Sequence, residues 1–278
     1  MSTAHDPAQS PLGKSTVYAE GYDAALLFAI PRAPQRAGLD GWGQVPMHGL
    51  DLWNAYELSW LQPGGVPGVA VAEIRVPAES PCIVESKSLK LYLNGFAQTV
   101  VATPAQLAQT LETDLGAAAG AAVSVRLREP AALAGQSLAA WDGRSIDQLA
   151  TQVASCDAPQ PDLLQCASRR LVDECLVSDL LRSRCPVTGQ PDWASVQIRY
   201  HGPEWDAASV LRYLLSYRTH AEFHEHCVER IHHDLWRRLG PDRLTVYARY
   251  TRRGGIDINP IRSSEPVQAV ANPRLPRQ

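Results

Sequence analysis

One order of strand and helix patterns occurs twice along this chain, and that repetition constrains the fold more than any other feature. In the first half, residues 69–76 have the two-residue period of a strand, and two helical patterns follow before a second strand pattern at 123–127. In the second half, strand-like segments at 172–181 and 196–200 precede two helical patterns and a strand pattern at 244–250. Strand pairs that bracket helix pairs predict an α+β chain with two antiparallel sheets, each with helices on one face.

Local signals predict where the two helices of the first half begin and end. Ser86 precedes apolar residues at helical spacing and is expected to cap the first helix. Thr103 and Pro104 form a strong helix start, because threonine is a good N-cap and proline suits the first helical position. Gly116 is predicted to end this second helix, after a stripe of leucines.

The length of 278 residues suits one large domain or two small ones. Residues 1–50 carry many prolines and glycines and are predicted to form an irregular arm. We expect a first module at 51–150 and a second at 151–278, connected by the Ala-, Gly- and Pro-rich segment 130–161.

Composition excludes several classes of protein. With 26 Lys and Arg against 29 Asp and Glu, the net charge of −3 argues against a nucleic-acid scaffold or a polybasic membrane anchor. The first residues lack the apolar region of a secretion signal, and no apolar run is long enough to span a membrane. The six cysteines contain no C-x-x-C pair. We therefore expect a cytoplasmic protein with reduced thiols and no local zinc knuckle.

Cys185 and Asp192 are the first candidates for chemistry. Two prolines and a glycine in the segment CPVTGQPDW interrupt any regular element, so the thiol is expected on a loop with the carboxylate just past the turn. A cysteine with a carboxylate partner suits covalent catalysis, because the carboxylate exchanges a proton with the thiol or its adduct. On composition alone, however, a free cysteine is more often a small buried structural residue than a catalytic one.

The segment FHEHCVERIHHDL, from residue 223 to 235, is the second candidate. Val228 stands where a zinc-protease motif needs its second histidine, so that motif is absent. His224 and Glu225 remain, at a predicted helix start. The carboxylate can accept two N–H groups from a planar heterocycle, or it can simply complement the helix dipole. The residues alone leave both readings open.

Two basic segments are candidates for binding phosphate. In ESKSLKLYLNGF, two serines and Lys87 stand at a predicted helix start, where backbone N–H groups favour anions. In RYTRRGGIDINP, Arg253 follows another arginine and precedes Gly254 and Gly255, and the glycines allow a ligand to approach the backbone closely. Either cluster alone is more often a solvated surface.

Together these segments resemble the NADPH-dependent 7-cyano-7-deazaguanine reductases, the nitrile reductases of queuosine biosynthesis, in their long two-module form. The matching segments are ESKSLKLYLNGF at 85–96, CPVTGQPDW at 185–193, FHEHCVERI at 223–231 and YARYTRRGGIDINP at 247–260. GKSTVYAEGYDAALLFAIPR near the start and YELSWL at 56–61 are similar too, so the resemblance spans nearly the whole chain. Leu89 and Gly95 stand where the family usually has phenylalanine and serine, which affects packing more than chemistry.

The resemblance implies a fold, an assembly and a reaction. The fold would be two tandem tunnelling-fold modules like those of GTP cyclohydrolase I, each a four-stranded antiparallel sheet backed by two helices. The chains would form a homodimer with active sites where module surfaces meet. Cys185 would attack the nitrile to form a thioimide, Asp192 would supply the proton, and two NADPH molecules in succession would reduce the product of that attack to an amine. This is a step of a tRNA-modification pathway.

The resemblance also implies roles for residues at matching positions. Those expected to bind the deazaguanine are Val84, Glu85, Ser86, His224 and Glu225. Those expected to contact NADPH are Ser86, Lys87, Arg253 and Gly254. No metal, nucleic acid or membrane partner is expected.

Two other functions remain open at this point. A zinc-dependent cyclohydrolase on the same fold would need a complete Cys and His cluster, and the cysteine spacing does not offer a local one. A purine-binding module without catalysis would have no need of the pair formed by Cys185 and Asp192. Bound zinc would favour the former, and tight binding without a covalent adduct would favour the latter.

Overall fold

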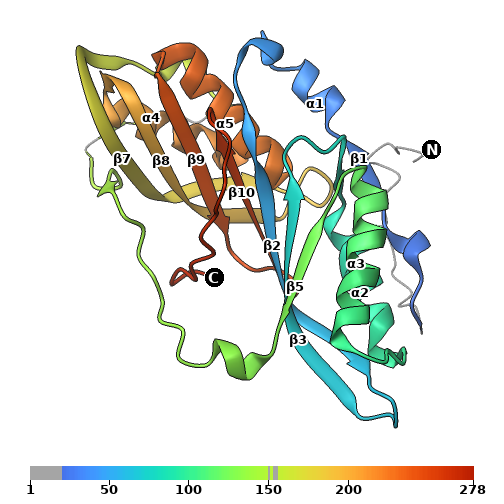
Figure 1. Cartoon of the computed structure of the whole chain (residues 1–278). Helices are drawn as coiled ribbons and strands as arrows, with labels where there is room; N and C mark the ends of the chain where they lie inside the picture. Colours follow the sequence, from blue (N-terminus) through green and yellow to red (C-terminus); the bar gives the residue numbers. More distant parts are fainter. Residues whose placement is uncertain (1–20, 150, 153–155) are drawn as a thin grey trace. The chain divides into compact units, whose positions relative to one another are not determined.

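The computed structural model describes residues 21–149, 151, 152 and 156–278. The chain divides into two compact units. Of the described residues, the first unit contains 21–34, 50–137 and 252–258, and the second contains 35–49, 138–251 and 259–278. Both units combine antiparallel strands with helices, so the expected α+β class is confirmed (Figure 1).

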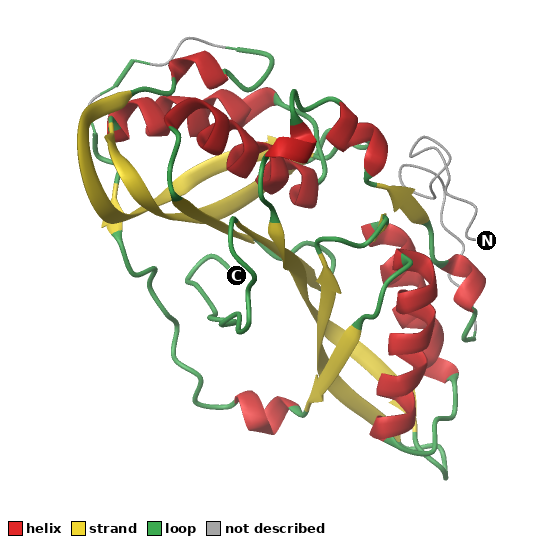
Figure 2. Ribbon diagram, turned by 45° about the horizontal axis from the view of Figure 1, so that its top comes forward, coloured by secondary structure: helices red, strands yellow, loops and turns green. Residues whose placement is uncertain are grey.

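The first unit is an antiparallel sheet with two helices on one face (Figures 1 and 2). Its strand order is β5-β3-β2. The strands are β2 (His48–Leu61, whose first two residues belong to the second unit), β3 (Pro67–Pro77) and β5 (Ser124–Arg128), and the helices are α2 (Ser86–Gly95) and α3 (Pro104–Ala119). A separate antiparallel pair is formed by β1 (Ala29–Pro31) and β4 (Cys82–Val84), which leads directly into α2.

The core of the first unit lies between this sheet and the helices. On α3, Leu107, Leu111 and Leu115 form one stripe and are at most 1% exposed. They pack with apolar residues of β3 such as Ile74, as the predicted leucine stripe requires. Each leucine removed from water in this way contributes roughly 1.5–3 kcal/mol. The apolar spacing therefore fixes which face of α3 meets the sheet.

The second unit repeats this plan with longer strands (Figures 1 and 2). Its strand order is β10-β9-β8-β7-β6. The strands are β6 (Arg144–Ser145), β7 (Cys166–Arg184), β8 (Pro191–Trp205), β9 (Arg243–Tyr250) and β10 (Ile256–Ser263, whose first three residues belong to the first unit), and the helices are α4 (Ala207–Leu215) and α5 (His224–Leu239).

Its core is made by helices α4 and α5 against β7, β8 and β9. Val228, Ile231 and Leu235 of α5 are fully buried, and they belong to one cluster with Val196 and Ile198 of β8. These are the positions that the helical and strand periods predict to face inward. The core consequently lies on one face of the sheet, and the alternate residues of β7 and β8 point to the other face.

The remaining elements are short. They are α1 (Ala33–Ala37) and the 3₁₀ segments η2 (Ala24–Leu26), η3 (Trp42–Gln44), η4 (Phe96–Gln98), η5 (Pro130–Leu133), η6 (Pro161–Leu163) and η7 (Ser216–Thr219). Within the described part of the chain, no helix is long and apolar enough to cross a membrane.

Several predicted elements are confirmed, and two helix ends were predicted wrongly. The strand patterns at 69–76, 172–181, 196–200 and 244–250 fall within strands, and the pattern at 123–127 agrees with β5 to within one residue. Glu85, not Ser86, caps α2, because its longer side chain reaches two backbone N–H groups. Helix α3 continues through Gly116 to Ala119. It ends at Gly120, whose φ of 72° is the left-handed conformation that suits a C-cap.

The compact units also differ from the predicted modules. Residues 35–49, expected in the arm, pack with the second unit, and residues 252–258, expected in the second module, pack with the first. Strands β2 and β10 were not predicted as strands. Residues 1–20 of the predicted arm, with the start of the family-like segment there, lie outside the described residues.

One departure from the family pattern has a structural explanation. A Cβ at Gly95 would lie 2.6 Å from the backbone oxygen of Gly21. Glycine at this position therefore lets the segment that begins at residue 21 approach the end of α2, where Tyr22 contacts the ring of Phe96. Leu89 is simply a buried core residue, 2% exposed.

Candidate active site

Cys185 stands immediately after β7, on the loop that the sequence predicts. Its backbone N–H donates to the oxygen of Gln190 at 2.8 Å, and its oxygen accepts from the N–H of Gly189 at 3.0 Å. Gly189 has a φ of 68°, which glycine adopts without strain. Cys185 is only 4% exposed. The loop thus closes tightly on itself and holds the cysteine in a shielded position.

Asp192 lies close to this cysteine because β7 and β8 are paired. Ser183 stands opposite Asp192, so these two side chains face the same side of the sheet. The hydrogen bond from the Cys185 N–H to the oxygen of Gln190 continues this pairing one residue beyond Arg184, which favours the same side for Cys185. That side is the helix-covered one, since the neighbouring Ala194 is fully buried in the core. Cys185 and Asp192 are diagonal neighbours, with backbones roughly 7–8 Å apart. One small substrate group can therefore contact both.

His224 and Tyr250 complete this end of the second unit. His224 is the first residue of α5, and its Nε2 lies 3.3 Å from Oδ2 of Asp192. The imidazole stacks on the ring of Tyr250, with centroids 3.9 Å apart and planes 15° from parallel. Tyr250 is the last residue of β9 and stands opposite Ala194. Two strands, a loop and a helix start therefore bring a thiol, a carboxylate and an imidazole together.

The groups behind this cluster are buried and held neutral. Burial raises the pKa of the Tyr250 hydroxyl well above its ordinary value, and the nearby Cys227 and Asp192 raise it further. Burial likewise raises the pKa of the Cys227 thiol, helped by the charge of Glu222. These residues support the site from within the core, whereas Cys185 occupies the loop at its rim.

Glu225 follows His224 in the first turn of α5 and is 2% exposed. A carboxylate at this position complements the positive end of the helix dipole, which is the simpler of the two readings left open by the sequence. The N-cap residue Phe223 has no side-chain hydrogen bond to the helix, so no side-chain cap competes with that carboxylate. Binding of a heterocycle by Glu225 stays a prediction.

The other predicted substrate residues belong to the first unit. Val84 ends β4 and is 4% exposed, and Glu85 is 1% exposed at the cap of α2. The Glu85 carboxylate accepts from the backbone N–H groups of Lys87 and Ser88, both at 2.8 Å. Burial raises the pKa of Glu85, and these two hydrogen bonds oppose that shift. Ser86 is half-buried beside it.

Arg253 and Gly254 lie in a tight turn of the first unit. Arg253 and Ile256 form an antiparallel bridge around two glycines, Gly254 and Gly255, with φ values of 60° and 74°. Positive φ at both central positions is what a type I′ turn requires. A Cβ at Gly255 would lie 2.4 Å from the carboxyl carbon of Glu57, so a larger residue here would displace the Glu57 side chain.

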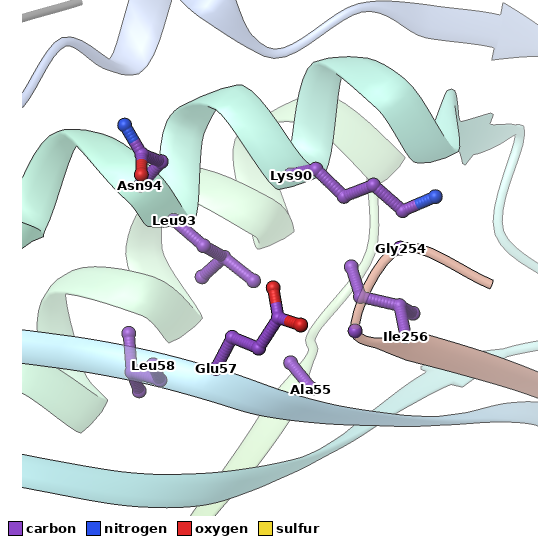
Figure 3. A pocket seen from close by; sticks show the side chains of 9 residues that line it. Ala55, Glu57, Leu58, Lys90, Leu93, Asn94, Gly254 and Ile256 are labelled. Atoms are coloured by element: carbon purple, nitrogen blue, oxygen red, sulfur yellow. The ribbon is translucent and has the colours of Figure 1, made fainter. Parts of the chain in front are cut away.

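A small pocket opens beside this turn (Figure 3). Glu57 of β2 and Lys90 of α2 border it together with Gly254 and Ile256. Its volume of about 100 Å³ is well below the roughly 300–1,000 Å³ of typical ligand sites, so it can take only part of a larger molecule. Sequence reasoning missed Lys90, although it stands within the segment ESKSLKLYLNGF.

The first unit has features that fit a phosphate-bearing cofactor. A Cβ at Gly254 would lie 3.0 Å from Nζ of Lys90, so a side chain at this position would crowd this ammonium. Lys87 adds a second ammonium at the start of α2. The backbone N–H groups of Lys87 and Ser88, expected to be offered to phosphate, are instead occupied by Glu85. Binding here would rely on side chains.

The predicted site residues thus form two groups. The second unit contains Cys185, Asp192, His224 and Glu225, and the first unit contains Val84, Glu85, Ser86, Lys87, Arg253 and Gly254. Tyr250 was not predicted, because its alternation in β9 marks it only as a buried strand residue. Among the described residues, no three His, Cys, Asp or Glu side chains are arranged to hold a metal ion. These residues therefore offer no ligand set for the zinc of a cyclohydrolase.

Fold and site together define a class of protein: an α+β enzyme with a cysteine, a carboxylate and an imidazole at one end of a helix-backed antiparallel sheet. Comparison with known proteins narrows this class. A family model described as nitrile reductase, 7-cyano-7-deazaguanine-reductase N-terminus, matches residues 18–127, and the model of the QueF-like proteins matches residues 191–269.

Similar proteins cover almost the entire chain. The NADPH-dependent 7-cyano-7-deazaguanine reductase of Bordetella parapertussis is 52% identical over 271 residues, which are 98% of this chain and 99% of the relative. The proteins of the same name from Bordetella pertussis and Bordetella bronchiseptica match to the same extent. The chain belongs to the 7-cyano-7-deazaguanine reductase family of nitrile reductases.

Proposed function

We propose that this enzyme reduces the nitrile of 7-cyano-7-deazaguanine to the aminomethyl group at the expense of two NADPH, a step of queuosine biosynthesis. Family membership and the names of the relatives support the reaction. The observation that carries the assignment of residues is the cluster of Cys185, Asp192 and His224 at one end of the second unit.

The chemistry of a nitrile explains why a thiol and a carboxylate are needed. A nitrile carbon is a weak electrophile, so direct hydride transfer to it is slow. Attack by the Cys185 sulfur forms a C–S bond and breaks one π bond of the nitrile, and the nitrogen takes up a proton. The resulting thioimide is a better hydride acceptor than the nitrile.

Asp192 is the proposed source of that proton. Its carboxyl shares one sheet face with Cys185, so it can reach the nitrogen of a nitrile whose carbon is at the sulfur. His224, 3.3 Å away, orients this carboxyl and can replace the proton it gives up. Tyr250 holds the imidazole plane. The buried position of Cys185 protects the thioimide from hydrolysis by water.

The remaining predicted residues are assigned by their resemblance to the family. Val84, Glu85, Ser86, His224 and Glu225 would bind the deazaguanine, with the carboxylates accepting its N–H groups. Ser86, Lys87, Arg253 and Gly254 would bind NADPH, which supplies the hydrides of the reaction. The open backbone at Gly254 and the ammonium groups near it support this assignment.

The assembly is also part of the proposal. The two helix-backed antiparallel units would be tandem tunnelling-fold modules, and two chains would form a homodimer whose active sites lie where module surfaces meet. The predicted substrate and cofactor residues are divided between the two units. A site that is completed by assembly would account for this division.

The test follows NADPH absorbance after addition of 7-cyano-7-deazaguanine and quantifies the amine by mass spectrometry. We expect two NADPH consumed per amine. The Cys185→Ala variant should bind substrate without turnover, and Asp192→Asn should turn over very slowly. Cys166→Ala removes an exposed cysteine of the same unit and should be fully active. Full turnover by Cys185→Ala would end the covalent assignment.

A further inference from the structure

An unusual concentration of arginines surrounds Trp193, the residue after Asp192. The guanidinium carbons of Arg182, Arg218 and Arg277 lie 5.2, 5.8 and 5.7 Å from the centre of the Trp193 ring. Arg184, the residue before Cys185, lies close enough that its charge acts on Arg182. We name these four arginines and Trp193 the arginine patch. All five residues belong to the second unit.

Within the described part of the chain, no carboxylate forms an ion pair with an arginine of the patch. Arg182 donates to the backbone oxygen of Arg218, and Arg277 donates to that of Asp179. Elsewhere in the same unit, Arg36, Arg230 and Arg262 are each paired with a carboxylate at 2.7–2.9 Å. The patch therefore retains its positive charge, whereas the charges of these three arginines are neutralised.

Trp193 explains how the arginines stay together without being neutralised. An aromatic face attracts a guanidinium and fixes its orientation while leaving its charge in place, whereas a carboxylate would cancel it. Burial and the charges of Arg184 and Arg218 lower the pKa of Arg182, which shows the mutual repulsion. Each guanidinium has five N–H donors, and the backbone contacts use only a few of them. The remaining donors suit phosphate oxygens.

The patch lies at the same strand ends as the reacting groups. Arg182 stands opposite Trp193 in the β7–β8 pair, next to the opposing pair Ser183 and Asp192. Because side chains alternate, Arg182, Arg184 and Trp193 point to the face away from the helices, whereas Asp192 points to the other face. Only the strand ends and the Cys185 loop separate the two. A long ligand that crosses this rim can contact both.

We propose that the arginine patch binds the phosphate groups of NADPH. This inference rests on the proposed function, which requires the nicotinamide to reach a carbon held at Cys185. All the cofactor contacts expected from the family resemblance belong to the first unit, yet the cofactor must also contact the second unit to reach that carbon. A dinucleotide with three phosphate groups is long enough to extend from the thiol across the rim, and the arginines match its charge.

The test measures the dissociation constant of NADP⁺ by titration calorimetry on the full chain, without turnover. Arg218 and Arg277 are exposed, so the double variant R218Q/R277Q should fold normally, as a thermal melt will check. We expect its NADP⁺ affinity to fall at least ten-fold. The control R170Q/R199Q loses the same charge from exposed arginines that have carboxylate partners, and its affinity should stay within two-fold of wild type.

The same titration with NAD⁺ identifies the phosphate that is bound. A loss confined to NADP⁺ assigns the patch to the 2′-phosphate, and an equal loss for both assigns it to the pyrophosphate. Unchanged NADP⁺ affinity in R218Q/R277Q, or an equal loss in the control, overturns the inference. Capture of the nitrile by Cys185 needs no NADPH, so it should be normal in R218Q/R277Q. Failure of capture and of NADP⁺ binding in the wild type would instead overturn the proposed function.

Discussion

At the scale of single residues, the site depends on side chains whose neighbours fix their orientation. His224 contacts Asp192 through one ring nitrogen and lies flat against Tyr250, so its plane is set by a core residue that was not among the predicted site residues. The sequence indicated Cys185, Asp192 and His224 as candidates because their residue types carry chemistry. It could not predict Tyr250, because stacking depends on how β9 lies beside β8.

Replacing Tyr250 tests this positioning role. Tyr250→Leu removes the ring that holds the imidazole, and we expect covalent capture by Cys185 to slow at least ten-fold and its pH profile to shift. Tyr250→Phe keeps the ring and should capture at nearly the wild-type rate. Tyr200→Leu removes an equally buried tyrosine of the same core and should reduce stability only. A wild-type rate and pH profile for Tyr250→Leu would show that the stack has no such role.

Gly95 offers a second test at this scale. A Cβ there would lie 2.6 Å from the Gly21 oxygen, so Gly95→Ala must displace the backbone of the neighbouring segment. We expect a loss of about 1–3 kcal/mol in the free energy of unfolding, measured by chemical denaturation. Gly43→Ala, where a Cβ meets nothing within 4 Å, is the control and should be nearly neutral. Equal stability of the two variants would contradict the close approach.

At the scale of elements, hydrophobic spacing predicted which segments are helices and strands, and local chemistry predicted some of their ends. Thr103 and Pro104 start α3 as expected, because this cap acts within one turn of the chain. Gly116 did not end α3, since a helix tolerates glycine at a cost of about 1 kcal/mol when its flanking turns are buried. Strand β2 was not predicted because 7 of its 14 residues are buried, five of them in succession, which obscures the two-residue period.

The cap of α3 makes a prediction about stability. The Thr103 hydroxyl accepts from the N–H of Gln106 at 3.1 Å. Thr103→Ala leaves this N–H without the side-chain acceptor, and the free energy of unfolding should fall by about 1 kcal/mol. Thr103→Ser keeps the hydroxyl and should lose much less. Denaturant titrations compare the two, and an equal loss would indicate that the methyl group matters and the cap does not.

At the scale of the whole molecule, the chain builds two units from segments that are not contiguous. Residues 35–49 and 252–258 each belong to the unit that the sequence did not suggest. Composition marks the first of these segments as irregular, and no local pattern indicates where an irregular segment packs. The predicted modules therefore divide most site residues as the structure does, but Arg253 and Gly254, expected in the second module, lie in the first unit.

The buried histidine of the second unit makes a prediction about acid stability. Burial, and then the charge of Arg262, lower the pKa of His232 to about 3. As the pH falls below about 6.5, His232 binds a proton in the unfolded chain but stays neutral in the folded chain. His232 therefore leaves the free energy of unfolding unchanged above pH 6.5. Between pH 6.5 and pH 3 it lowers that free energy by about 1.4 kcal/mol for each pH unit of acidification.

Denaturant titrations between pH 7 and pH 5 check this slope. His232→Gln removes the titrating group and should flatten the dependence of stability on pH by that amount. His201→Gln removes a partly exposed histidine that is paired with Asp242 and should change the slope far less. An unchanged slope in His232→Gln would show that this imidazole does not titrate as its burial requires.

The central claim is that Cys185 captures the nitrile covalently. Intact-protein mass spectrometry after incubation with 7-cyano-7-deazaguanine, without NADPH, tests it most directly. The account predicts a mass gain of one substrate per chain, mapped to Cys185 by peptide analysis, present in Cys166→Ala and absent in Cys185→Ala. A wild-type protein that binds the nitrile but gains no mass, or an adduct that persists in Cys185→Ala, would contradict it.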